Sequence, residues 1–116
     1  MIRCGIGLFW TSFAHAHAFL DHADPKVGSH LASAPSIVTL WFTDELQPAK
    51  CGIQVFDSKG NPVDKHDPHP DPADNTALRI SLEPLATGTF TVRWQATCID
   101  GHKTEGTFSF TVDPHP

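Results

Sequence analysis

Histidine and aspartate residues near the two ends of the chain form the donor set best suited to chemistry. His17 directly follows Ala14-His15-Ala16, a small-x-small motif typical of signal-peptide cleavage sites. Cleavage there makes His17 the first residue, and its free α-amine and ring nitrogen then chelate one metal ion together. Asp100-Gly101-His102 adds a carboxylate and a second imidazole. Nitrogen and oxygen donors of this kind favour Cu(II) in tetragonal geometry, so the sequence predicts a Cu(II) site.

The start of the chain has the pattern of an export signal. A basic residue precedes the apolar run 4–13, and the small-residue motif follows it. Because a membrane span needs about 20 apolar residues, we expect no stable membrane insertion after cleavage. We therefore expect a signal peptide over 1–16 and a periplasmic domain over 17–116. A second small-x-small motif, two residues earlier, would expose His15 instead, so the exact cleavage bond stays open.

The segment after the signal has the size and charge of one small acidic domain. One hundred residues support a single core of modest size, and we expect a monomer. The formal net charge of −5 provides no basic surface for nucleic acid or anionic lipid. The composition therefore excludes nucleic-acid binding and is compatible with a metal cation.

Two cysteines, Cys51 and Cys98, remain once Cys4 leaves with the signal. An even pair in an oxidising compartment predicts one disulfide. Its closed loop of about 48 residues would stabilise the fold by about 4 kcal/mol.

Short stretches of alternating apolar and polar residues indicate strands. They predict strands over 37–42, 52–57, 77–82, 89–96 and 107–112, with 17–23 as a first strand at a sheet edge. Two apolar faces are expected in the core, formed by Phe90, Val92 and Trp94 and by Phe108, Phe110 and Val112. No stretch shows helical periodicity. The fold class is therefore all-β, an Ig-like Greek-key β-sandwich or barrel of about seven antiparallel strands.

The remaining histidines are expected at the periphery. His22 should lie on the surface and His30 in a turn. His66 and His69 belong to the tract 64–72, whose three alternating prolines argue against regular structure. We expect a solvated loop there, and a weak metal-gathering role for its two histidines stays open.

Two longer segments carry residues that resemble those of a known family. The first comprises His17-Ala18-Phe19-Leu20, Pro25, Gly28, Leu31, Pro35, Val38, Leu40, Phe42 and Leu46. The second comprises Gly88-Thr89-Phe90-Thr91-Val92-Arg93-Trp94, Asp100-Gly101-His102, Gly106 and Phe108. Together they resemble the CopC family of copper-resistance proteins over essentially the whole mature chain. The resemblance implies a seven-stranded β-barrel or sandwich, the Cu(II) ligands His17, Asp100 and His102, and a CopD-type inner-membrane copper transporter as partner.

The chain departs from that family pattern in three places. Its only methionine is Met1, so it resembles the Cu(II)-only branch that lacks a methionine-rich Cu(I) loop. Cys98 stands where a small hydroxyl residue is expected, and Lys103 where a proline is frequent. On an extended strand Cys98, Asp100 and His102 would share one face, so a thiolate ligand to copper stays open beside the favoured disulfide.

Two other classes of function compete with a copper carrier. A copper-dependent oxidative enzyme with an N-terminal histidine brace would resemble the lytic polysaccharide monooxygenases. This chain has no tyrosine, is too short for a broad substrate surface, and places Asp100 where oxygen activation needs an open position. A metal-free Ig-like adhesion module would leave the histidine signatures unexplained. We therefore expect a non-enzymatic protein for copper homeostasis or resistance. Whether it serves copper uptake or copper resistance, and whether it also binds Cu(I), stays open.

Overall fold

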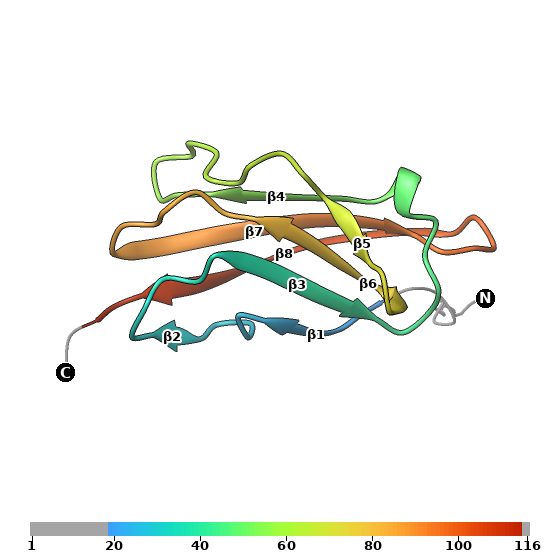
Figure 1. The fold of residues 1–116 in the computed structure, drawn as a ribbon, viewed down its shortest axis with the longest axis horizontal. Coiled ribbons are helices and arrows are strands. Elements are labelled where there is room, and N and C mark those ends of the chain that lie inside the picture. Colours follow the sequence, from blue (N-terminus) through green and yellow to red (C-terminus); the bar gives the residue numbers. More distant parts are fainter. Residues whose placement is uncertain (1–18, 115–116) are drawn as a thin grey trace, which may run out of the picture.

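The computed structural model describes residues 19–114, which form two β-sheets packed face to face (Figure 1). The expected signal peptide and His17 lie outside the described residues. Nowhere within 19–114 is there a helix with the length and hydropathy needed to cross a membrane.

Each sheet contains four strands. The first has the order β1 (Leu20–Asp24), β3 (Ile37–Phe42), β6 (Asp74–Ser81) and β5 (His69–Asp71). The second has the order β2 (His30–Leu31), β8 (Lys103–Val112), β7 (Gly88–Thr97) and β4 (Gly52–Phe56). A short 3-10 helix, η2 (Pro48–Lys50), precedes β4. All pairings are antiparallel except that of β2 with β8.

The expected all-β sandwich is confirmed, with eight strands within residues 19–114 in place of about seven. Each of the five strands predicted between 37 and 112 matches a strand of the structure, and β1 lies at a sheet edge as expected. The expectation of a turn at His30 is wrong, because the two residues of β2 pair with the end of β8.

The expectation that the tract 64–72 has no regular structure is also wrong, since β5 lies within it. Pro70 has no N–H to donate, and a proline is tolerated where a strand is paired on one side only. β5 is such an edge strand, paired with β6 alone. The edge position of β5 in the sheet, and not its local sequence, therefore allows a strand that contains Pro70.

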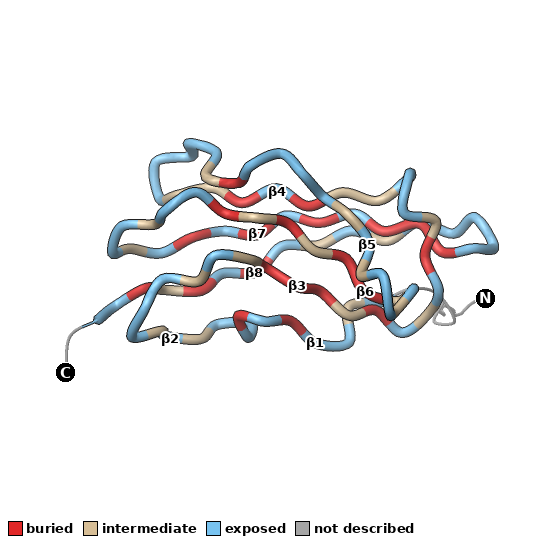
Figure 2. The backbone as a smooth tube through the Cα atoms, in the orientation of Figure 1, coloured by how far each residue is buried: buried red, intermediate tan, exposed pale blue. Residues whose placement is uncertain are grey.

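Apolar side chains from both sheets fill the space between them, as the buried stretches of β3, β6 and β7 show (Figure 2). Both apolar faces expected from the sequence are buried. Phe90 stacks on Phe110 with 5.5 Å between ring centroids, and Phe42 meets Trp94 edge-on at 5.2 Å. Each such side chain contributes about 1.5–3 kcal/mol through its burial. The resulting core fixes β7 and β8, and these two strands position the site.

Candidate metal centre

The hairpin between β7 and β8 brings three potential metal ligands together. The Cys98 N–H donates to the His102 carbonyl at 3.0 Å, and the Gly101 N–H donates to the Cys98 carbonyl at 2.9 Å. Gly101 has φ of +93°, which glycine adopts without steric cost. This arrangement matches a three-residue hairpin loop that ends in a left-handed residue. The chain therefore reverses at 99–101, so the condition of an extended strand through Asp100 is not met.

The turn nevertheless gathers the side chains that an extended strand would have placed on one face. Ligand atoms of Cys98, Asp100 and His102 all lie within 4.8 Å of one another. The side chains of Asp100 and His102 are 51% and 57% exposed, whereas Cys98 is fully buried. The cluster thus offers oxygen and nitrogen donors at the surface and a sulfur donor beneath them.

The Asp100 carboxylate is the centre of this cluster. Its Oδ1 accepts hydrogen bonds from the Cys98 thiol and from the His102 N–H at 3.0 Å, and it lies 2.9 Å from Nδ1 of His102. The hydrogen bond from Cys98, followed by those from His102, holds the pKa of Asp100 well below its usual range. Asp100 is therefore a charged oxygen donor throughout the neutral range.

The loop that follows β3 anchors the hairpin turn. Its Glu45 carbonyl accepts the Ile99 N–H at 3.1 Å. The Gln47 N–H donates to the Thr97 carbonyl at 2.8 Å, and the Gln47 side-chain amide donates to the Cys98 carbonyl at 3.0 Å. The backbone on the β7 side of the turn, from Thr97 to Ile99, is thus tied to one neighbouring segment.

The same loop also holds the first described residue. The Thr43 N–H donates to the Phe19 carbonyl at 2.9 Å, and the Thr43 hydroxyl accepts the Phe19 N–H at 3.0 Å. β1 therefore begins at the end of the molecule that carries the β7–β8 hairpin (Figure 1). His17 precedes Phe19 by two residues, a distance of about 7 Å in extended chain.

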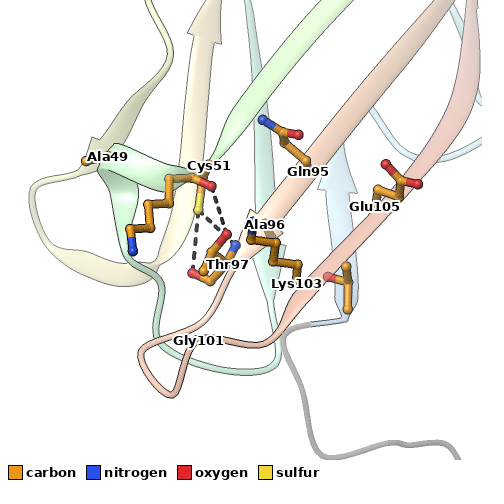
Figure 3. Close-up of a pocket in the computed structure, with 10 residues that line it drawn as sticks. Ala49, Cys51, Gln95, Ala96, Thr97, Gly101, Lys103 and Glu105 are labelled. Carbon is orange, nitrogen blue, oxygen red and sulfur yellow. Dashed lines mark hydrogen bonds between the residues drawn. The ribbon is translucent and has the colours of Figure 1, made fainter.

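The predicted disulfide is absent, because Cys51 and Cys98 are free thiols. Cys51 Sγ donates to the Gln47 carbonyl at 3.2 Å and accepts the Thr97 N–H at 3.3 Å, whereas Cys98 donates to Asp100. The two sulfur atoms thus face different partners. Burial raises the pKa of the Cys51 thiol, the Thr97 N–H lowers it, and the nearby Cys98 raises it further. Cys51 lies in a pocket beside Thr97, with Lys103 across from it (Figure 3).

The other histidines that the structure describes lie outside the cluster. His22 is on the surface as expected, stacked on Trp41 with 4.3 Å between centroids. Nδ1 of His66 lies 3.2 Å from the Asp64 carboxylate, and Nδ1 of His69 lies 2.7 Å from the Asp67 carbonyl. Within residues 19–114, the hairpin cluster is the only group of three close donors.

The fold is thus a small β-sandwich that presents sulfur, oxygen and nitrogen donors on one hairpin, as a candidate metal site. Residues 20–113 match the CopC domain. The chain belongs to the CopC family, whose members are periplasmic copper-binding proteins and not enzymes. It is accordingly a copper resistance or transport protein, and the monooxygenase and adhesion-module alternatives lose their support.

Sequence relatives agree with this assignment. Protein YobA of Escherichia coli (strain K12) is 31% identical over 98 residues, which cover 84% of this chain and 79% of YobA. Copper resistance protein C of Xanthomonas campestris pv. juglandis is 30% identical over 105 residues, which cover 85% and 82% of the two chains. Copper transport protein CutJ of Bacillus subtilis (strain 168) is 28% identical over 103 residues, covering 88% of this chain and 19% of CutJ.

Solved structures confirm the CopC-like fold. CopC from Methylosinus trichosporium OB3b superposes with a TM-score of 0.79 at 34% identity, covering 86% of this chain and 97% of that one. PcoC, a methionine-rich copper resistance protein from Escherichia coli, gives 0.75 at 30% identity, with 84% and 100% covered.

Proposed function

We propose that this protein binds Cu(II) in the periplasm through His17, Asp100 and His102, and buffers the ion or passes it to a membrane transporter. The observation that carries the proposal is the pairing of Asp100 with His102 on an exposed hairpin, 2.9 Å between Oδ1 and Nδ1. A charged carboxylate beside an imidazole is half of a tetragonal Cu(II) donor set. The short distance between these two atoms keeps the carboxylate and the imidazole side by side.

The other half of the donor set would come from His17. Cleavage before this residue supplies an α-amine and a second imidazole on the same residue. The loop after β3 supports a position of these two donors near the hairpin, because it is hydrogen-bonded both to Phe19 and to the turn. Only Ala18 separates His17 from the anchored Phe19 in the sequence.

The absence of methionine favours Cu(II) as the main cargo. The sequence has one methionine, Met1, and the expected signal cleavage removes it. No thioether donors would then remain to make a methionine-based Cu(I) site. We therefore place this chain in the Cu(II)-binding branch of its family.

A transport partner is proposed from the relative CutJ. The region similar to this chain makes up 19% of that copper transport protein. A CopC-like segment thus occurs within a single polypeptide that transports copper. We propose that this chain acts as a separate monomer in the role of that segment. It would bind copper and deliver it to a CopD-type inner-membrane transporter.

Intact mass of the exported protein, measured with and without one equivalent of Cu(II), tests the proposal. We expect the mass of 17–116, two free thiols and one bound copper ion. Electron paramagnetic resonance then assigns the ligands: His102→Ala and Asp100→Asn should each change the Cu(II) spectrum, whereas His66→Ala should not. The reverse pattern would move the site to the tract 64–72.

A further inference from the structure

The proposed Cu(II) site leaves one member of the donor cluster without a role. Cys98 is fully buried, and its thiol donates to the Asp100 carboxylate. Asp100 in turn is half-exposed. An ion that binds this carboxylate from solvent is therefore close to the Cys98 sulfur atom, because the carboxylate accepts the hydrogen bond of that thiol.

The spacing of the donors fits a single transition-metal ion. For zinc, nitrogen and sulfur ligands lie about 2.0–2.3 Å from the metal, so two ligands on one ion are separated by up to about 4.6 Å. The ligand atoms of Cys98, Asp100 and His102 lie within 4.8 Å of one another. Small side-chain adjustments are thus enough to place all three around one ion.

We propose that Cys98 Sγ, together with His102, binds Cu(I), so that the hairpin accepts both oxidation states of copper. The inference rests on the proposed copper site and adds a sulfur ligand to it. Thiolates are soft ligands that select Cu(I), and imidazole also binds copper. On binding, the S–H bond of Cys98 breaks, its proton passes to solvent and an S–Cu bond forms. No electron is transferred, because the ion arrives as Cu(I).

Cys51 provides an internal control for this role. Its sulfur contacts the backbone of Gln47 and Thr97, and it is not a member of the three-residue donor cluster. Cys51 and Cys98 are therefore two free thiols with different neighbouring donors. A sulfur effect specific to the copper site should appear at Cys98 alone.

A different explanation is that Cys98 only positions Asp100 through its hydrogen bond. Serine and alanine separate the two roles. Cys98→Ser keeps a donor for Asp100 and removes the soft ligand, whereas Cys98→Ala removes both. A coordinating sulfur makes the two variants alike towards Cu(I), and a positioning role makes serine resemble the native cysteine.

The test uses mature protein without oxygen and Cu(I) as the probe, in competition with a chromogenic Cu(I) chelator. We expect Cys98→Ser and Cys98→Ala each to lose more than about 100-fold in Cu(I) affinity, beyond the usual loss for residues that only support a ligand. Cys51→Ser should keep the native affinity. Far-UV circular dichroism of both Cys98 variants, compared with that of the native protein, shows whether they fold.

X-ray absorption of the Cu(I)-loaded native protein and of Cys51→Ser gives a measurement that does not depend on a core variant. A sulfur scatterer at copper in both supports the inference, and its absence from both overturns it. Native Cu(I) affinity in Cys98→Ser would likewise overturn it. Loss of Cu(II) binding by the native protein, with Cu(I) binding intact, would instead refute the proposed function.

Discussion

Gly106 of β8 lies opposite Trp94 of β7, and the indole occupies the space that a side chain at position 106 would need. A Cβ atom added to Gly106 would lie 2.7 Å from Cζ2 and 2.9 Å from Cε2 of Trp94. Carbon atoms normally meet at about 3.5–4.0 Å. Trp94 is 7% exposed and packs against Phe42, so the ring cannot withdraw without disturbing the core.

Gly106→Ala should therefore destabilise the sandwich. Overpacking costs about 1–3 kcal/mol, and the lower chain entropy of alanine offsets about 0.5–1 kcal/mol of this. A net loss of about 1–2 kcal/mol corresponds to a fall in Tm of about 4–16 °C for a domain of this size. Thermal and urea unfolding, followed by circular dichroism, measure both quantities.

Gly52→Ala is the matched control for this substitution. Its added Cβ would meet the side-chain nitrogen of Gln95 at 3.4 Å, and that flexible side chain can move aside. We expect stability equal to or slightly above that of the native protein. Equal stability of the Gly106→Ala and Gly52→Ala variants would refute the packing argument at Trp94.

Three further predictions concern burial and pH. Asp64→Ala should cost about 1–3 kcal/mol in urea unfolding, because the buried carboxylate accepts the Val55 N–H at 2.9 Å and that donor would lose its partner; native stability would contradict this. Cu(II) affinity, measured by chelator competition, should fall steeply from neutral to mildly acidic pH, because imidazole and amine ligands must lose their protons; a flat affinity would exclude these ligands. The protein should stay folded at the mildly acidic pH at which it releases copper. The Ser81 N–H holds the pKa of Asp67 below its usual range. This carboxylate therefore contributes fully to stability above pH about 3.9 and loses that contribution only as the pH falls through its lower folded-state pKa. Unfolding seen by far-UV circular dichroism at mildly acidic pH would contradict that order.

The strand pattern was predictable because burial in a sandwich imposes a period of two. Phe90, Val92 and Trp94 alternate with polar residues, and all three face the core in β7. Local sequence failed where position in the sheet decides the outcome. Pro70 argues against a strand in isolation, yet an edge position next to β6 accommodates it.

The donors of the hairpin could be indicated from the sequence, but their arrangement could not. Residue types and proximity in sequence were enough to single out Asp100 and His102. Cys98 was placed beside them only on the condition of an extended strand, whereas the turn at Gly101 brings the three together. A clearer signal was present in the sequence, because Asp-Gly between two alternating segments is typical of a hairpin.

The disulfide was predicted from the number and expected compartment of the cysteines alone. Such counting contains no information about side-chain direction. In the fold, Cys51 is engaged by the backbone near η2, and Cys98 by the carboxylate of Asp100. The hydrogen-bond partners of the two sulfur atoms, which depend on tertiary structure, decide the outcome.

The central claim is that a free histidine at position 17 completes the copper site of Asp100 and His102. Its most direct test compares Cu(II) affinity, by chelator competition, between a protein that begins at His17 and one with a single extra residue before it. The extra residue converts the α-amine into an amide and removes the chelate while leaving every other donor in place. We predict tight binding of one Cu(II) ion by the first protein and far weaker binding by the second; equal affinities would contradict the claim.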